Sequence, residues 1–381
     1  MYHMNNPSQG FYNYAHKNRV LVVCTTDSMI WNFLIIHIKE LQKRGYEVEC
    51  ACSKTGFFFD ELVNQHGFIL HEIQVHRSPF SFQNISALKE LVRILRNGKF
   101  NNVFCHEPMG GVLGRIAAKR CHCSVNYMAH GFHFYKGAPL INKIVYYTVE
   151  KILSYITDAL IVINNEDYEA AKKFHAKRVF KTHGIGIDTS KFQKSLDYIY
   201  LLNNECHLPA DVFKVLTVGE MIVRKNHEVL IKALSFLPDN VHLFIAGTGE
   251  LETYLKQMAE NINVNQRVHF LGFRKDVKNI CNSADLFVFP SFQEGLSVAL
   301  MEAMGCGLPI VASNIRGNND LIVNGKGGVL IDDNNPLLYK DAIQSFMDNK
   351  NACKEAGCFN EKHVKQFDMS VVVDELKEIY P

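Results

Sequence analysis

The sequence lacks several features that would place it in a common functional class. Its 381 residues include one tryptophan and no apolar run that approaches the length of a membrane span. No cysteine pair has the Cys-x-x-Cys spacing of a zinc or redox site, and no Asp-x-Asp motif follows a predicted strand. We therefore expect a protein without membrane spans that needs neither a bound metal nor a cofactor.

The first predicted loop contains no glycine. Arg19 to Thr26 form an apolar run typical of a buried parallel strand, and Asp27 to Ile30 follow as the loop. A dinucleotide-binding domain would carry Gly-x-Gly-x-x-Gly at this place, because its backbone closely approaches a pyrophosphate. The absence argues against an NAD(P)-dependent enzyme.

Composition bounds the size, the compartment and the charge of the molecule. A chain of this length with 47% apolar residues is too long for one compact core, so two α/β domains are expected. The eleven cysteines are an odd number, and we expect them to be reduced cytosolic thiols.

The two halves of the chain differ in charge. Residues 1–190 hold 22 Lys and Arg against 15 Asp and Glu, whereas the remainder holds 19 Lys and Arg against 24 Asp and Glu. This asymmetry indicates an anionic partner for the first half, unless it is chance scatter over solvated faces.

The most informative stretch runs from Pro290 to Pro309. Apolar runs at 284–289 and 310–313 flank it and are typical of buried strands, and we expect a helix over residues 296–304 between them. The first N–H groups of a helix have no intrahelical partners and attract anions such as a diphosphate. Here these groups would belong to Gly295, Leu296 and Ser297.

Two glutamates accompany the start of that helix. Glu294 precedes it, and Glu302 lies about two turns into it. A carboxylate beside a phosphate is repulsive unless it accepts hydrogen bonds from neutral hydroxyl groups, which a sugar supplies. The pattern favours a site for a sugar joined to a diphosphate. The alternative is an ordinary strand–helix–strand unit with two exposed glutamates.

The whole pattern Pro-Ser-x2-Glu-Gly-x6-Glu-Ala-x3-Gly-x-Pro resembles the signature of the retaining nucleotide-sugar glycosyltransferases of family 4. The resemblance extends over residues 18–380 and is strongest at 268–331 and 125–170. It implies an α/β protein with the GT-B fold, in which two doubly wound Rossmann-like domains face a central cleft. It also implies transfer of a sugar from a nucleoside diphosphate, with UDP as the expected nucleotide and with retention of anomeric configuration.

The resemblance also suggests which residues bind the donor. Relatives commonly have Gly-Arg-x4-Lys after the first strand of the second domain, and the Arg and Lys bind the diphosphate. Here Gly219 is followed by Glu220, a charge reversal, while Lys225 matches the Lys and Arg224 is a candidate for the missing cation. The alternative is a pair of surface cations. In relatives the first Glu orients the sugar, the second accepts the ribose hydroxyls, and a loop cups the base, which suggests Glu294, Glu302, Phe273 and Arg274 respectively.

The acceptor side is expected in the first domain. His130-Gly131 after a predicted strand resembles the His-Gly of relatives, whose His faces the transferred sugar; a purely structural His is the alternative. His106, at the carboxyl end of another predicted strand, and His133 are further candidates. The resemblance implies catalytic roles for His130, Glu294 and Lys225.

The run from His130 to Pro139 resembles the subset of the family found in bacterial capsular and exopolysaccharide assembly. Those enzymes extend a polyprenyl-diphosphate-linked sugar at the inner face of the cell membrane. A basic, aromatic first half suits such an acceptor. The expected partners are a nucleotide-sugar donor and a lipid-linked saccharide, with no nucleic acid. We expect a cytoplasmic protein, with peripheral attachment to the inner membrane face as a further hypothesis.

Domain boundaries and alternatives complete the prediction. We expect a flexible tail at 1–17, a first domain at 18–188, a linker at 189–211, a second domain at 212–365 and a C-terminal helix at 366–381 that crosses back. Within the family's architecture, the activity would be that of a hexosyl- or N-acetylhexosaminyltransferase. A sugar-nucleotide epimerase of the same architecture and a non-catalytic nucleotide-sugar-binding scaffold remain alternatives.

Overall fold

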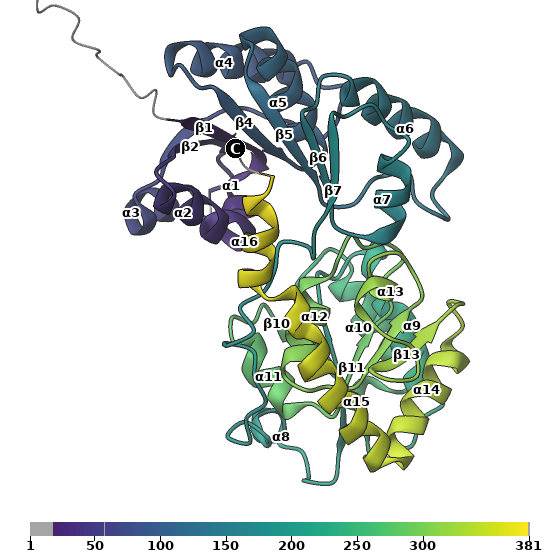
Figure 1. Ribbon diagram of the computed structural model, residues 1–381. Helices are drawn as coiled ribbons and strands as arrows, with labels where there is room; N and C mark the ends of the chain where they lie inside the picture. The colour runs from purple at the N-terminus through teal and green to yellow at the C-terminus, as the bar shows by residue number, and fades with distance from the viewer. Residues whose placement is uncertain (1–17, 57, 380–381) are drawn as a thin grey trace, which may run out of the picture. The chain divides into compact units, whose positions relative to one another are not determined.

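The computed structural model describes residues 18–56 and 58–379 (Figure 1). The predicted tail at 1–17 lies outside these residues. The chain divides into two compact units between Asn126 and Tyr127. In the described part, no helix is both long and apolar enough to pass through a bilayer.

Two parallel sheets organise the chain. The first has the strand order β3-β2-β1-β4-β5-β6-β7, and the second has the order β10-β9-β8-β11-β12-β13. Both orders turn back at the first strand of the sheet, which is the pattern of a doubly wound Rossmann-like fold. The predicted α/β class with two such sheets is confirmed.

The first unit alternates strands and helices from its first described residues. Its elements are β1 (Arg19–Thr26), α1 (Asp27–Met29), a π-helical turn (Ile30–Leu34), α2 (Ile35–Lys43), β2 (Glu47–Ser53), α3 (Phe59–His66), β3 (Ile69–Glu72), α4 (Gln83–Asn97), β4 (Asn102–His106) and α5 (Pro108–Cys121). Strand β5 (Ser124–Ala129) spans the division between the units.

The second unit completes the first sheet and contains the whole second sheet. Before the second sheet come α6 (Leu140–Ser154), β6 (Ala159–Val162), α7 (Asn165–Ala171), β7 (Arg178–Lys181) and α8 (Leu201–Glu205). The second sheet and its helices are β8 (Phe213–Val218), α9 (His227–Leu234), β9 (Val241–Ala246), α10 (Glu252–Asn261), β10 (Val268–Gly272), α11 (Val277–Ser283), β11 (Leu286–Phe289), α12 (Val298–Gly305), β12 (Ile310–Ser313), α13 (Asn318–Leu321), β13 (Gly328–Ile331), α14 (Pro336–Asp348), α15 (Lys350–His363) and α16 (Met369–Lys377). Short 3₁₀ turns lie at Val223–Lys225, Asn265–Arg267 and Val364–Phe367.

The second sheet is covered on both faces. Neighbouring residues of β8 point to opposite sides: Val215 packs with the apolar residues of α9, α10 and α14, and Leu216 packs with those of α11 and α12. Figure 1 shows these helices around the strands. Burial on both faces explains why the strands are continuous apolar runs, and hence why their positions were predictable.

The central helix differs from its predicted start. Helix α12 begins at Val298 instead of Leu296, because Ser297 has an extended backbone and acts as the N-cap: its hydroxyl accepts a hydrogen bond from Leu300 N at 3.4 Å. The residues predicted to supply the first-turn donors, Gly295, Leu296 and Ser297, therefore precede the helix. Glu302 is its fifth residue, so it lies about one turn into the helix instead of two.

The last helix contacts the end of the first sheet within the same unit. Ile187 forms a bridge with Asp368, just before α16, and His183 N donates to Glu375 Oε2 at 2.9 Å. Arg178 at the start of β7 donates to Ile379 O at 3.4 Å. These contacts connect a segment near residue 180 with the C-terminal helix, a pairing that could not be derived from local sequence.

Candidate active site

The loops that follow β8 and β11 lie side by side at the carboxyl edge of the second sheet. Strands β8 and β11 are neighbours, with Val215 opposite Leu286, and the strand order reverses at β8. In open α/β sheets this switch point is where ligands bind. The loops are held together by Phe292 N donating to Arg224 O at 2.8 Å and by Asn226 Nδ2 donating to Pro290 O at 3.1 Å.

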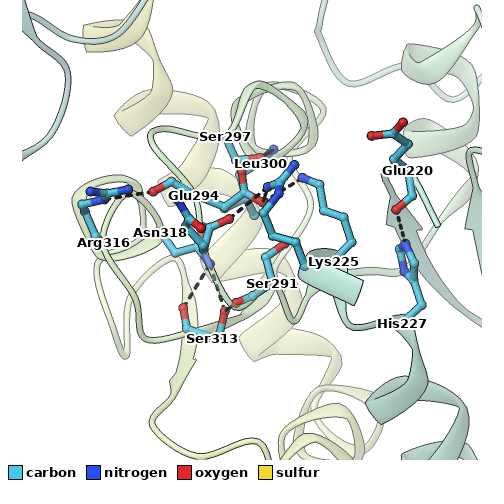
Figure 2. Close-up of polar contacts among 12 residues, drawn as sticks. Glu220, Lys225, His227, Ser291, Glu294, Ser297, Leu300, Ser313, Arg316 and Asn318 are labelled. Atoms are coloured by element: carbon cyan, nitrogen blue, oxygen red, sulfur yellow. Dashed lines mark hydrogen bonds and ion pairs between the residues drawn. The ribbon is translucent and has the colours of Figure 1, made fainter. Parts of the chain in front are cut away.

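Three of the predicted site residues form one charged cluster between these loops (Figure 2). Glu294 Oε1 accepts from Arg224 Nη1 at 2.9 Å and from Lys225 Nζ at 2.8 Å. Burial lowers the pKa of Lys225, although Glu294 opposes that shift, and its ammonium lies 4.5 Å from the ring centre of Phe289. Two cations share one carboxylate oxygen, so the cluster carries an excess positive charge that suits an anion.

Glu302 differs from Glu294 in its surroundings. Its side chain is half-buried, and among the described residues its carboxylate makes neither a hydrogen bond nor an ion pair. Burial raises its pKa to about 7. A carboxylate held without donors would gain most from a ligand that supplies hydroxyl groups.

A pocket of about 270 Å³ lies at the carboxyl ends of β8, β9 and β10. It is lined by Gly219, Phe273 and Arg274, three predicted donor residues, together with Val218, Glu220, Ala246, Gly247, Thr248 and Val277. A Cβ on Gly247 would come within 2.0 Å of Gly219 O, so only glycine permits this approach of the two loops.

Arg274 is oriented by two carboxylates instead of standing as an unpaired cation. Its guanidinium contacts Asp276 Oδ2 and Glu205 Oε2, each at 2.7 Å. These hydrogen bonds hold the guanidinium of Arg274 beside the pocket, and the two carboxylates already compensate its positive charge. Phe273 is exposed at the pocket's edge, which leaves its ring face available to a flat ligand.

Gly295 has a role that sequence reasoning missed. A Cβ at this position would lie 1.9 Å from His130 O, and a Cβ on Gly131, whose φ is +125°, would lie 3.0 Å from Gly295 Cα. The two glycines therefore allow the backbone after β5 to pass directly beside Glu294. This approach brings the predicted His130-Gly131 pair and the predicted Glu294-Gly295 pair to one place in the second unit.

The two other histidines have different surroundings. The ring of His133 is tilted by 34° against that of Tyr146 of α6, with 4.8 Å between ring centres, and burial and the nearby Arg316 lower the pKa of His133. His106 is the buried last residue of β4 in the other unit. Glu107 follows it with φ of +63°, and its Oε2 accepts from Thr25 N at 2.9 Å near the end of β1.

A buried ion pair supports the candidate site and was also missed. Arg316 Nη1 contacts Asp167 Oδ1 and Phe132 O, both at 2.8 Å, while Arg316 Nε donates to Glu294 O at 3.1 Å. Asn164, the N-cap residue of α7, donates from Nδ2 to Gly295 O at 3.2 Å. The network holds the backbone on both sides of the peptide that joins Glu294 to Gly295.

Comparison with known proteins identifies the family. The family model for glycosyl transferases group 1 matches residues 204–363, and one for glycosyl transferase 4-like proteins matches residues 19–164. The glycosyltransferase EpsD of Bacillus subtilis is 32% identical over 95% of this chain and 96% of its own length. An α-1,3-galactosyltransferase of Escherichia coli is 30% identical over 89% and 90%, respectively.

A solved structure agrees in fold. Anabaena HepE superposes with a TM-score of 0.80 over 96% of this chain and 99% of its own, at 17% identity. The two doubly wound sheets, their strand orders and this likeness together establish the GT-B fold. The chain is a glycosyltransferase that belongs to the glycosyl transferases group 1 family.

Proposed function

We propose that the protein transfers a hexose or N-acetylhexosamine from a UDP-sugar to a polyprenyl-diphosphate-linked saccharide, with retention of anomeric configuration, in the synthesis of a capsular polysaccharide or exopolysaccharide. The observation that carries the proposal is the cluster of Arg224, Lys225 and Glu294. Glu302 of α12 adds a carboxylate that has no hydrogen-bond partner among the described residues. Two cations, a sugar-facing carboxylate and a ribose-facing carboxylate are the groups that a nucleoside-diphosphate sugar requires.

Binding of the donor would exchange one anion for another. The diphosphate competes with Glu294 for Arg224 and Lys225, whose charges one carboxylate oxygen compensates incompletely. Release of Glu294 from one or both cations leaves its oxygens available to accept hydrogen bonds from the hydroxyls of the transferred sugar. The first N–H groups of α12 add a further positive potential at the diphosphate.

The rest of the nucleotide would lie along the same edge of the sheet. The ribose hydroxyls donate to Glu302, and the base enters the pocket bounded by Gly219, Phe273 and Arg274. Anabaena HepE has been solved with UDP and glucose, which supports UDP as the nucleotide for a chain of this fold.

The chemical step needs charge stabilisation more than a protein nucleophile. The bond from the anomeric carbon to the diphosphate oxygen breaks, and a bond forms on the same face to the acceptor oxygen. The acceptor's proton passes to the departing diphosphate, whose growing charge Lys225 and Arg224 stabilise. His130, whose carbonyl lies beside Gly295, contacts the transferred sugar.

The acceptor is inferred from relatives and from the chemistry of the first half. The Escherichia coli relative acts on GlcNAc-diphosphoundecaprenol, as its name states, and a Staphylococcus aureus relative, 24% identical over 96% of this chain, serves capsular polysaccharide biosynthesis. A lipid-linked acceptor also suits the excess of Lys and Arg in residues 1–190.

A transfer assay tests the proposal. The purified chain is incubated with UDP-galactose, UDP-glucose, UDP-N-acetylglucosamine or GDP-mannose and with GlcNAc-diphosphoundecaprenol in detergent, and products are identified by mass spectrometry and NMR. We expect an α-linked product from one UDP-sugar and a loss of at least a hundredfold in kcat for Glu294→Gln. Glu228→Gln, which alters an exposed pair with Lys232 in the same unit, is the matched control.

Two outcomes would replace the proposal. A sugar nucleotide that changes configuration without any acceptor would identify an epimerase. Binding of UDP without turnover on lipid-linked or soluble acceptors would favour a non-catalytic scaffold. Equal turnover with a soluble saccharide would leave the glycosyltransferase assignment intact and overturn the lipid-linked acceptor.

A further inference from the structure

Helix α6 presents an apolar face that nothing in the described chain covers. Its residues at intervals of three and four, together with the first residue after it, form a continuous stripe along the helix. Five of these side chains are between 57% and 72% exposed: Leu140, Ile141, Ile144, Ile152 and Tyr155. Val145 and Val149, each 37% exposed, border the stripe.

The opposite face of α6 accounts for its attachment to the protein. Leu153 and Ser154 are buried, and the ring of Tyr147 packs edge-on against Phe134 and Phe174. Glu150 is buried as well and accepts from Tyr127 OH at 3.2 Å. The helix is therefore anchored by one face, and the apolar stripe is additional to what its packing requires.

The charged side chains that α6 itself exposes have one sign. Glu150 is the only acidic residue of α6, and it faces inward. Lys136 and Lys143 are exposed, and Lys151 lies with its ammonium 5.9 Å from the ring centre of Tyr147. An apolar stripe bordered by lysines, with tyrosines beside it, complements the acyl chains and anionic headgroups of a bilayer surface.

We propose that α6 is a membrane-docking helix that lies in the plane of an anionic bilayer. Its stripe enters the boundary between headgroups and acyl chains, while Lys136, Lys143 and Lys151 contact lipid phosphates. The choice of a bilayer over an acidic protein rests on the proposed function, because a polyprenyl-diphosphate acceptor is itself held in a membrane. The surface would bring the enzyme to that acceptor without a membrane span.

Vesicle flotation tests the inference with the full chain. Vesicles of phosphatidylcholine with 30% phosphatidylglycerol are compared with pure phosphatidylcholine, at low and high salt. We expect binding to the anionic vesicles only, weakened by salt because headgroup attraction is screened. The variants Ile141→Ser/Ile144→Ser/Ile152→Ser and Lys143→Glu/Lys151→Glu should each lower the bound fraction at least fivefold.

Matched variants control for general effects. Phe236→Ser removes another exposed apolar side chain, just after α9. Lys354→Glu reverses another exposed cation, in α15. Both should bind vesicles as the wild type does. Circular dichroism and UDP binding of all variants check that the fold and the donor site are intact.

The outcomes separate docking from function. No vesicle binding by the wild type, or unchanged binding by both α6 variants, would overturn the inference. So would a wild-type dimer that the isoleucine variant dissociates without any vesicle binding, since a second copy would then cover the stripe. Transfer to a detergent-solubilised acceptor should persist in the α6 variants; its absence in the wild type would instead contradict the proposed function.

Discussion

At the scale of single residues, Glu302 is the group whose protonation should control donor binding. Burial raises its pKa to about 7, above the usual value of 4.5. The folded chain thus binds more protons than the unfolded chain between these values, and the free energy of unfolding falls as pH rises through that window. In the proposed site, ribose hydroxyls would stabilise the ionised carboxylate, so a bound nucleotide should lower this pKa again.

This linkage predicts the pH dependence of UDP affinity. Wild-type affinity should rise about tenfold more between pH 5.5 and 8 than that of Glu302→Gln, which cannot ionise. Protonation of the UDP phosphate, whose pKa is about 6, affects both proteins equally, so the variant also controls for it. Calorimetric titrations at four pH values measure the difference. Parallel pH profiles for the two proteins would show that Glu302 does not contact the nucleotide.

The two cations at Glu294 should differ in importance. The Lys225 side chain is 13% exposed, whereas that of Arg224 is 40% exposed and thus better screened by water. We expect Lys225→Met to weaken UDP binding by roughly fiftyfold or more, and Arg224→Ala by roughly tenfold. Calorimetry with UDP and with uridine decides whether the loss is confined to the diphosphate, as it should be. An equal loss with uridine would point to a disturbed fold instead.

The buried pair of Asp167 and Arg316 should contribute strongly when broken. Their side chains are 1% and 3% exposed, so either charge alone would be left without compensation. Asp167→Asn should lower the free energy of unfolding by roughly 3 kcal/mol. Adding Arg316→Met to it should restore part of that loss, which urea denaturation would measure. The exposed pair of Glu228 and Lys232 provides the control, where Lys232→Ala should cost under about 1 kcal/mol. A double variant less stable than Asp167→Asn would contradict this account.

At the scale of elements, the start of α12 depends on Ser297. Its hydroxyl caps the helix through Leu300 N, so Ser297→Ala should lower the free energy of unfolding by roughly 1 kcal/mol. Ser297→Thr keeps the hydroxyl and should cost much less. Because the cap also fixes the helix end that would face the diphosphate, we expect UDP affinity to fall with the first variant only. Urea denaturation and calorimetry on the same preparations would test both; equal effects of the two variants would exclude the cap.

Elements with a strong apolar signal were predicted closely, and capped or irregular ones were not. Strands β1 and β12 have the predicted limits because both are uninterrupted apolar runs. Helix α12 starts two residues late because a local side-chain hydrogen bond sets its end. Helix α13 begins at Asn318, and a hydrogen bond from Gly317 N to Asp320 Oδ2 stabilises that start.

Helix α15 was not predicted, because its apolar residues are few and its sequence contains glycine. Gly357 lies at the helix's close approach to Gly307, where a Cβ would come within 2.1 Å of Gly307 O. Tertiary packing thus explains a residue that lowers helix propensity. The pairing of Lys225 with the Glu294 site came from the resemblance to a family, whereas the local pattern at 290–309 alone indicated a site for a sugar joined to a diphosphate.

At the scale of the whole molecule, the order of strands explains why distant residues share a site. Lys225 and Glu294 are 69 positions apart, and β8 and β11 bring them within 2.8 Å. A doubly wound sheet makes such a meeting predictable, since the carboxyl ends of its central strands are adjacent. Asp167 and Arg316, 149 positions apart, have no such rule, because their contact depends on loop conformations.

The predicted domain limits at 18–188 and 212–365 remain predictions, as does the cleft between the domains. The end of β1 contacts the start of the segment after β4: Glu107 Oε2 accepts a hydrogen bond from Thr25 N at 2.9 Å. Burial raises the pKa of Glu107, and its backbone has a strained positive φ. In the proposed binding mode, the diphosphate would depend on the cations Arg224 and Lys225 of the second unit.

The measurement that tests the central claim most directly is calorimetric binding of UDP, GDP and ADP to the wild type, to Glu302→Ala and to the control Glu228→Ala. We predict micromolar binding of UDP, unchanged in the control and weakened at least tenfold in Glu302→Ala, or about 1.4 kcal/mol. No binding of any diphosphate, or equal binding by wild type and Glu302→Ala, would contradict the donor site proposed at the carboxyl edge of the second sheet.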